Sequence, residues 1–76
     1  MKELVAYISK NLVNNPDTVQ IEEINRGRNH VDLYVTVNPN DMGRVIGRRG
    51  RVVNAMRSLV RVAAIKQGKR VNLEIR

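Results

Sequence analysis

Two glycines enclose two arginines near the middle of the sequence, in the segment Val45-Ile46-Gly47-Arg48-Arg49-Gly50-Arg51-Val52-Val53. Because glycine has no Cβ atom, Gly47 and Gly50 would let a sugar-phosphate backbone come close to the protein chain. The guanidinium groups of Arg48 and Arg49 are always charged and bind phosphate without reading base sequence. The N–H groups at the start of a following helix would also attract phosphate. The segment therefore predicts a clamp for a nucleic-acid backbone.

Four neighbouring residues extend this candidate site. Arg44 and Arg51 lie on either side of the turn and would add positive charge. Ile46 and Val53 also flank the turn, and we expect them to line an aliphatic groove for the bases. Five more basic residues are expected to be a solvated helix face and loop that only strengthen the electric field: Arg57, Arg61, Lys66, Lys69 and Arg70.

The positive charge is concentrated in the second half of the chain. The 76 residues have a formal net charge of +7. Residues 1–42 contain four basic and six acidic residues, whereas residues 43–76 contain ten basic and one acidic residue. This imbalance favours an anionic partner, and nucleic acid is the commonest anionic partner of a small domain.

The composition excludes several classes of protein. With two Tyr and no Phe or Trp, the chain cannot form the aromatic platform on which many RNA-binding modules stack bases. The absence of Cys excludes disulfides and thiolate metal sites, and we expect no bound metal or cofactor. We identify no nucleophile paired with a base and no Walker sequence, so we expect no catalytic residues and no enzyme activity. No apolar run is long enough to cross a membrane, which favours a cytoplasmic protein without membrane contact.

The first half of the chain predicts one helix and two strands. Residues 2 to about 14 are typical of an amphipathic helix, whose apolar stripe would be Leu4, Val5, Ile8 and Leu12. Alternation from residue 18 predicts a strand, and residues 25–29 predict a turn. Residues 30–38 predict the clearest strand of the chain, with one apolar face formed by Val31, Leu33, Val35 and Val37.

The second half predicts two helices and a last strand. Asn38 and Pro39 are typical of a helix start, and Asp41 would lie in the first turn, where a carboxylate suits the helix dipole. This short helix would run to about Ile46 and end at Gly47 in a left-handed conformation. After Gly50 a longer helix is expected, with its core face formed by Val52, Met56, Leu59, Val60 and Ala63. Residues 71–76 alternate and predict the last strand.

The order of elements predicts an α+β fold. The first two strands are joined by a short turn and should be antiparallel. The second and third are separated by about thirty residues of helix, which suits a crossover between parallel strands. We therefore expect one domain over residues 1–76, with a three-stranded mixed sheet and three helices on its apolar face.

The turn resembles a known motif. Ile46-Gly47-Arg48-Arg49-Gly50, with Val53 following, is similar to the Ile-Gly-x-x-Gly-x-x-Ile core of the KH domain, with Val53 in place of the last Ile. The order of elements resembles that of the prokaryotic, type II KH fold. A chain of this size with Gly43 to Arg51 as its central segment resembles the small bacterial KH-domain protein A family.

The resemblance implies a function and partners. In that family, the loop Gly47 to Gly50 would clamp about four single-stranded RNA nucleotides, with the bases in a groove between helix and sheet. The resemblance also implies an RNA chaperone that pairs with itself or with a larger partner, KH-domain protein B. It further implies a role in post-transcriptional control, cell-wall homeostasis and cell length.

Two other functions remain open from the residues themselves. The chain could be a dimerisation or protein-interaction subunit whose RNA contact is secondary, because so small a core gains stability from a partner. It could also bind single-stranded or duplex DNA, with residues 41–65 forming a helix-turn-helix. Against duplex DNA, the longer helix would begin with Arg51, Val52 and Val53, two of which are aliphatic where base-reading polar side chains are needed.

Overall fold

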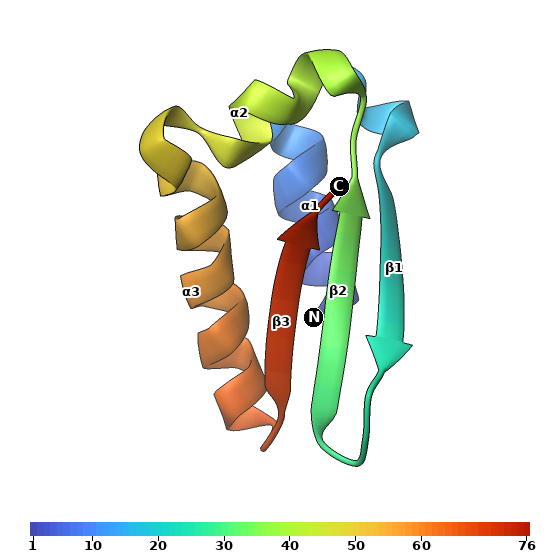
Figure 1. Cartoon of the computed structure of the whole chain (residues 1–76), viewed down its shortest axis with the longest axis vertical. Helices are drawn as coiled ribbons and strands as arrows, with labels where there is room; N and C mark the ends of the chain where they lie inside the picture. Colours follow the sequence, from blue (N-terminus) through green and yellow to red (C-terminus); the bar gives the residue numbers. More distant parts are fainter.

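A three-stranded sheet packs against helices in the computed structural model, which describes all residues from Met1 to Arg76 (Figure 1). The elements in order are α1 (Lys2–Leu12), β1 (Gln20–Asn25), β2 (His30–Thr36), α2 (Met42–Ile46), α3 (Arg51–Lys66) and β3 (Arg70–Ile75). Short 3₁₀ helices precede β1, α2 and α3, at Pro16–Thr18, Pro39–Asp41 and Arg48–Gly50. Figure 1 shows α1 behind the sheet and α3 beside β3. None of the helices combines the length and the apolar character needed to cross a bilayer.

The sheet has the predicted topology. Its strand order is β1-β2-β3. β1 and β2 are antiparallel, with Gln20 opposite Thr36, and β2 and β3 are parallel, with His30 beside Arg70. The parallel pair is joined by α2 and α3, as the length of the connection predicts. The α+β architecture expected from the sequence is confirmed.

The core is built around the central strand. Leu33 and Val35 of β2 are fully buried, because β2 has a neighbouring strand on each side and helices beneath. Ten buried side chains form the core cluster: Val5, Val19, Val31, Leu33, Val35, Val37, Val45, Met56, Val60 and Leu73. The predicted apolar face of β2 is thus confirmed.

The buried face of α3 differs from the prediction. Its buried residues are Val53, Met56, Val60 and Ala64. Leu59, which we expected in the core, is 55% exposed. The helix carries apolar residues around much of its circumference, so their spacing alone does not determine which stripe packs against the sheet. Packing against the sheet buries the stripe that contains Val53 and leaves the stripe that contains Leu59 exposed.

The start of α2 is held by a contact that the sequence does not reveal. Asn38 caps the 3₁₀ helix before α2, since its Oδ1 accepts a hydrogen bond from the Asn40 backbone N–H at 2.9 Å. Asp41 forms no cap at the start of α2. Its buried carboxylate accepts hydrogen bonds from the backbone N–H groups of Asn14 and Asn15, both at 3.1 Å, and from the Asn15 side-chain amide at 3.0 Å. Asp41 lies in the first helical turn after Asn38, as predicted, and it also ties the end of α1 to the start of α2, which the sequence did not indicate.

The turn between α2 and α3 requires glycine at its first position. Gly47 has φ +76° and ψ 171°, a region of backbone space that is essentially reserved for glycine. Its φ is positive as predicted, but its ψ is not that of a left-handed helical residue. A Cβ atom on Gly47 would lie 2.8 Å from Cβ of Val52. The turn is therefore tight because the backbone at Gly47 lies directly against the first turn of α3.

We predict that Asp41→Asn lowers the melting temperature by several degrees at neutral pH. The hydrogen bond from the Asn15 side chain lowers the pKa of Asp41, and so do those from the backbone and the charge of Arg44, against the opposing effect of burial. A lowered pKa in the folded protein means that the stabilisation is complete above the usual value of about 3.8 and is lost as the pH falls through the folded value. Thermal unfolding from pH 2 to 7 measures this effect.

In this comparison, the melting temperatures of the wild-type protein and Asp41→Asn should converge towards the acid end of the range. Asp17→Asn is a suitable control, because Asp17 is exposed and forms no side-chain hydrogen bond or ion pair. A constant difference in melting temperature between the wild-type protein and Asp41→Asn across the whole pH range would show that the stabilisation does not depend on ionisation of the Asp41 carboxyl group.

We also predict that alanine affects the two glycines of the turn unequally. Gly47→Ala should lower the free energy of unfolding by more than about 2 kcal/mol, because of the unfavourable backbone conformation and the overlap with Val52. Gly50→Ala should lower it by only about 1 kcal/mol, since Gly50 is left-handed but a Cβ atom there would lie 3.5 Å from the nearest Asn54 atom. Urea unfolding measures both values.

Gly43→Ala is the control for this pair, because Gly43 lies within α2 and a Cβ atom there would meet nothing within 4 Å. Alanine should raise stability at Gly43, by up to about 1 kcal/mol. Equal effects at Gly47 and Gly50 would show that the contact with Val52 does not shape the turn.

Candidate nucleic-acid interface

The turn between α2 and α3 exposes Arg48 and Arg49. Both side chains are exposed, and neither forms a hydrogen bond or an ion pair within the protein. The backbone of the turn is fixed, since the Gly47 N–H donates to the Gly43 carbonyl oxygen at 2.8 Å and the Gly50 N–H donates to the Gly47 carbonyl oxygen at 3.1 Å. Two cationic side chains without an internal partner therefore extend from a turn that backbone hydrogen bonds hold together.

Arg44 and Arg51 surround this turn with further charge. Arg44 lies on α2 and Arg51 is the first residue of α3, and both are exposed. The two ion pairs of the protein both involve Asp32, with Arg26 at 2.8 Å and with His30 at 3.5 Å. All four arginines near the turn thus lack a carboxylate partner, which leaves their charge available to an external anion.

The start of α3 offers fewer free N–H groups than we expected. No side chain caps this end of the helix. However, the N–H of Gly50 donates to Gly47 and the N–H of Arg51 donates to Arg48, within the 3₁₀ turn. These two backbone groups are therefore already hydrogen-bonded within the turn, whereas the side chains of Arg48 and Arg49 have no partner in the protein.

Ile46 and Val53 differ in exposure. Ile46 is 37% exposed and presents an apolar surface beside the turn. Val53 is only 6% exposed, because α3 turns this side chain into the protein. Ile46 therefore offers the larger apolar area beside the turn, and a role for Val53 in the groove stays a prediction, with this side chain supporting the surface largely from beneath.

Arg57 has a structural role that the sequence analysis missed. Its Nε donates a hydrogen bond to the carbonyl oxygen of Leu73 in β3, and its Nη1 donates to Oδ1 of Asn54, both at 3.1 Å. We expected Arg57 to be part of a solvated helix face. No sequence pattern signals this contact, because it joins α3 to the edge of β3 across a turn and depends on the tertiary arrangement.

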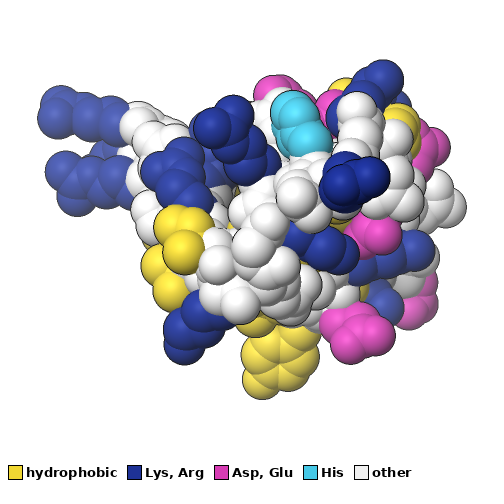
Figure 2. Space-filling model, turned by 90° about the horizontal axis from the view of Figure 1, so that it is seen from below, with side chains coloured by type: hydrophobic (Ala, Val, Ile, Leu, Met, Phe, Trp, Pro, Cys, Tyr) yellow, Lys and Arg dark blue, Asp and Glu magenta, His cyan; other side chains and the backbone are white.

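Acidic side chains are concentrated on one side of the molecule, whereas basic side chains are spread more widely. Figure 2, seen from the end opposite the turn, shows most of the Asp and Glu side chains towards the right of the view and a group of Lys and Arg towards the left. In Figure 1 the right of the molecule is formed by β1 and the left by α3. The α3 side is therefore the more favourable side for a polyanion.

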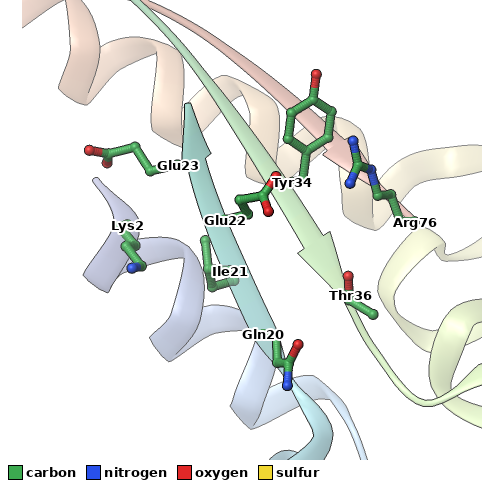
Figure 3. A pocket seen from close by; sticks show the side chains of 8 residues that line it. All are labelled: Lys2, Gln20, Ile21, Glu22, Glu23, Tyr34, Thr36 and Arg76. Carbon is green, nitrogen blue, oxygen red and sulfur yellow. The ribbon is translucent and has the colours of Figure 1, made fainter. Parts of the chain in front are cut away.

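A hollow of about 700 Å³ beside β1 has mixed charge (Figure 3). Its lining includes the carboxylates of Glu22 and Glu23 as well as the cations of Lys2 and Arg76. The Arg76 guanidinium group is already engaged, with its central carbon 3.8 Å from the centre of the Tyr34 ring. This hollow is a poorer place for a nucleic-acid strand than the surface around Arg48 and Arg49.

Comparison with known proteins gives consistent matches along the whole chain. Residues 2–75 match the family model described as KhpA/KhpB, KH domain. The chain is 49% identical to the RNA-binding protein KhpA of Caldanaerobacter subterraneus subsp. tengcongensis and 47% identical to that of Clostridium perfringens, over 99% of each chain. It is 41% identical to the RNA-binding protein KhpA of Chlamydia trachomatis, over 99% of this chain and 95% of the relative. No solved structure matches the chain. The chain therefore belongs to the KhpA/KhpB family of KH domains.

Proposed function

We propose that this chain binds single-stranded RNA and that Gly47, Arg48, Arg49 and Gly50 hold the RNA backbone. The observation that carries the proposal is the pair of exposed arginines without an internal partner, on a turn whose first glycine leaves no room for a side chain. The relatives from Caldanaerobacter and Clostridium are named RNA-binding proteins, which supports RNA as the ligand.

Each neighbouring residue has a distinct role in this proposal. Arg44 and Arg51 draw the strand to the turn through charge and contact further phosphates. Ile46 provides an aliphatic surface for a base. Val53 keeps the first turn of α3 in position from within the core and contacts RNA little, since it is buried.

The structure gives less support to duplex DNA as the ligand. A helix-turn-helix places the exposed N-terminal residues of its second helix against base edges in the major groove. In this chain, Val53 in the first turn of α3 is buried and Val52 is partly buried. Of the first three residues of α3, only Arg51 would therefore reach the groove. An arginine at this single position suits contact with phosphate rather than reading of bases.

We further propose, on the basis of the family resemblance, that the chain acts as one KH domain over residues 1–76 in the cytoplasm. In this proposal it is an RNA chaperone in post-transcriptional control, cell-wall homeostasis and cell length. It would pair with itself or with KH-domain protein B. Pairing is supported by Leu59 and Val62, which are apolar, lie three residues apart on α3 and are each 55% exposed.

We predict that Arg48→Asp combined with Arg49→Asp weakens binding to a fluorescent oligouridylate by at least about 100-fold at low salt, because two phosphate-binding cations become anions. The fold should be retained, since both side chains are exposed and Asp tolerates the left-handed backbone that Arg49 adopts, with φ 57°. Fluorescence anisotropy measures binding, and circular dichroism with thermal unfolding checks the fold.

The matched control is Lys2→Asp combined with Lys10→Asp, which makes the same change in net charge on α1. Both lysines are exposed and lie outside the turn. If both double variants bind RNA equally, the attraction comes from net charge alone and the proposed clamp is wrong.

We also predict that Val62→Glu reduces self-association, because a charge cannot be buried in an apolar interface without a partner. Sedimentation velocity over a range of concentrations should show dimers for the wild-type protein and mostly monomers for this variant. Gln20→Glu adds the same charge on β1 and should leave the dimer intact. A wild-type protein that is monomeric throughout, or dimers in both variants, would contradict pairing through this surface.

A further inference from the structure

The outer edge of β1 has no neighbouring strand, since β1 is the first strand in the sheet order β1-β2-β3. The Arg26 N–H donates to the His30 carbonyl oxygen at 2.8 Å, just beyond the end of β1. Hydrogen-bonded pairs alternate with non-bonded pairs along an antiparallel ladder, so every second residue of β1 directs its backbone groups away from β2. These outward-facing residues are Ile21, Glu23 and Asn25. Their N–H and C=O groups form a free edge, to which an extended chain can pair as a further strand.

The hollow of about 700 Å³ beside β1 lies around this free edge. Figure 3 shows that residues on both faces of the strand line it, with Ile21 and Glu23 on the side of α1 and Gln20 and Glu22 on the side of Tyr34. A strand added at the edge would also carry side chains on both faces. The hollow is therefore shaped as the space that such a strand would occupy.

The side chains of β1 specify the chemistry of an added strand. Residues 21–24 read Ile-Glu-Glu-Ile, and neighbouring residues of a strand point to opposite faces, so each face of β1 offers one isoleucine and one glutamate. Glu22 and Glu23 are exposed and form no ion pair. Opposite charges that face each other across two paired strands are favourable. Two adjacent basic residues with an aliphatic residue on either side would thus complement β1 position by position.

A second copy of β1 is a poorer occupant of the edge than a basic segment. Because the pattern Ile-Glu-Glu-Ile reads the same in both directions, two antiparallel β1 strands centred on it place glutamate opposite glutamate. Like charges in that position destabilise a strand pair. The glutamates therefore both oppose pairing between identical edges and attract a basic strand.

The two cations that line the hollow do not neutralise the glutamates of β1. Lys2 belongs to α1 and forms no ion pair with Glu23. The guanidinium group of Arg76 lies over the Tyr34 ring of β2, with its central carbon 3.8 Å from the ring centre, and so belongs to the part of the sheet behind β1. The charged side chains nearest to an added strand are those of β1 itself, Glu22 and Glu23.

We propose that the free edge of β1 binds an extended basic segment of another protein, which joins the sheet as a fourth strand. Two adjacent Lys or Arg residues of this segment pair with Glu22 and Glu23, and the aliphatic residues beside them contact Ile21 and Ile24. The inference is independent of the proposed RNA contact, because the turn between α2 and α3 does not line the hollow.

The probe for this proposal is a capped peptide of sequence Thr-Val-Lys-Lys-Val-Thr, added without RNA to the full chain. Amide hydrogen exchange measured by NMR should slow several-fold at Ile21, Glu23 and Asn25, because their N–H groups gain a partner. Exchange at Glu22 and Ile24 should change little, since their N–H groups already bond to β2. The same peptide with both lysines N-methylated keeps its charge but loses backbone donors, and it should not slow exchange.

Charge variants test whether the glutamates select a basic strand. Glu22→Gln combined with Glu23→Gln should weaken binding of the peptide roughly tenfold, because two cross-strand charge pairs are lost. The matched control is Glu3→Gln combined with Glu74→Gln, which makes the same change in net charge at exposed residues outside the hollow and should leave binding unchanged. Peptide titration followed by NMR measures both affinities.

Four results would overturn the proposal. Unchanged exchange at Ile21, Glu23 and Asn25 with the peptide present would show that the edge accepts no strand. Equal binding of the N-methylated peptide would reduce the contact to attraction between charges. Equal binding by Glu22→Gln with Glu23→Gln would show that the glutamates do not select the partner. Protection of the same amides that rises with protein concentration, without peptide, would assign the edge to a second copy of the chain.

Discussion

The closeness of the backbone at Gly47 to Val52 determines how the rest of this protein is arranged. Because no side chain separates the two residues, the chain can leave α2 and start α3 within one short turn. That turn directs α3 along β3, where Arg57 reaches the carbonyl oxygen of Leu73. The same turn leaves Arg48 and Arg49 at its outer side, where they meet no other part of the protein. The packing of α3 and the exposure of the cations thus have one common cause.

A small protein with a net charge of +7 must tolerate repulsion among its cations. This chain places its carboxylates mainly on the β1 side and leaves most cations around α3 without partners, so the repulsion is not relieved internally. Asp32 is the exception, because it is buried on the sheet and pairs with Arg26 at 2.8 Å. The uncompensated positive charge of these cations lowers the stability of the fold slightly, but it attracts a polyanion over the whole length of α3.

Local features of the fold were predictable from the sequence, and features that join distant residues were not. The alternation in β2, the cap at Asn38 and the positive φ of Gly47 depend on neighbours within a few residues. The hydrogen bonds of Asp41 reach residues 26 and 27 positions away, so nothing near Asp41 in the sequence indicates them. The buried face of α3 was predicted incorrectly because more than one apolar stripe was available on that helix.

The candidate site shows the same division. The positions of Arg48 and Arg49 on an exposed turn follow from the two glycines beside them, and the sequence was sufficient to predict them. Val53 was assigned to the groove because it follows the turn at the spacing of the KH motif, but the rotation of α3 buries it. That rotation depends on how the whole helix packs, which the motif does not contain.

Different faces of α3 have different surroundings, and this arrangement allows the proposed RNA contact at the turn and the proposed dimer to coexist. Val53, Met56, Val60 and Ala64 face the core. Arg57 contacts the edge of β3, whereas Leu59 and Val62 lie on a separate, exposed apolar face. A partner that covers this apolar face need not cover the turn, since Leu59 and Val62 lie two or more helical turns beyond Gly50. A dimer would then present two turns to one sufficiently long RNA molecule, and the second turn would act at a high effective concentration once the first was bound. A weak individual clamp would be sufficient in such an arrangement, which is consistent with a site built from flexible arginines rather than from a rigid base-reading surface.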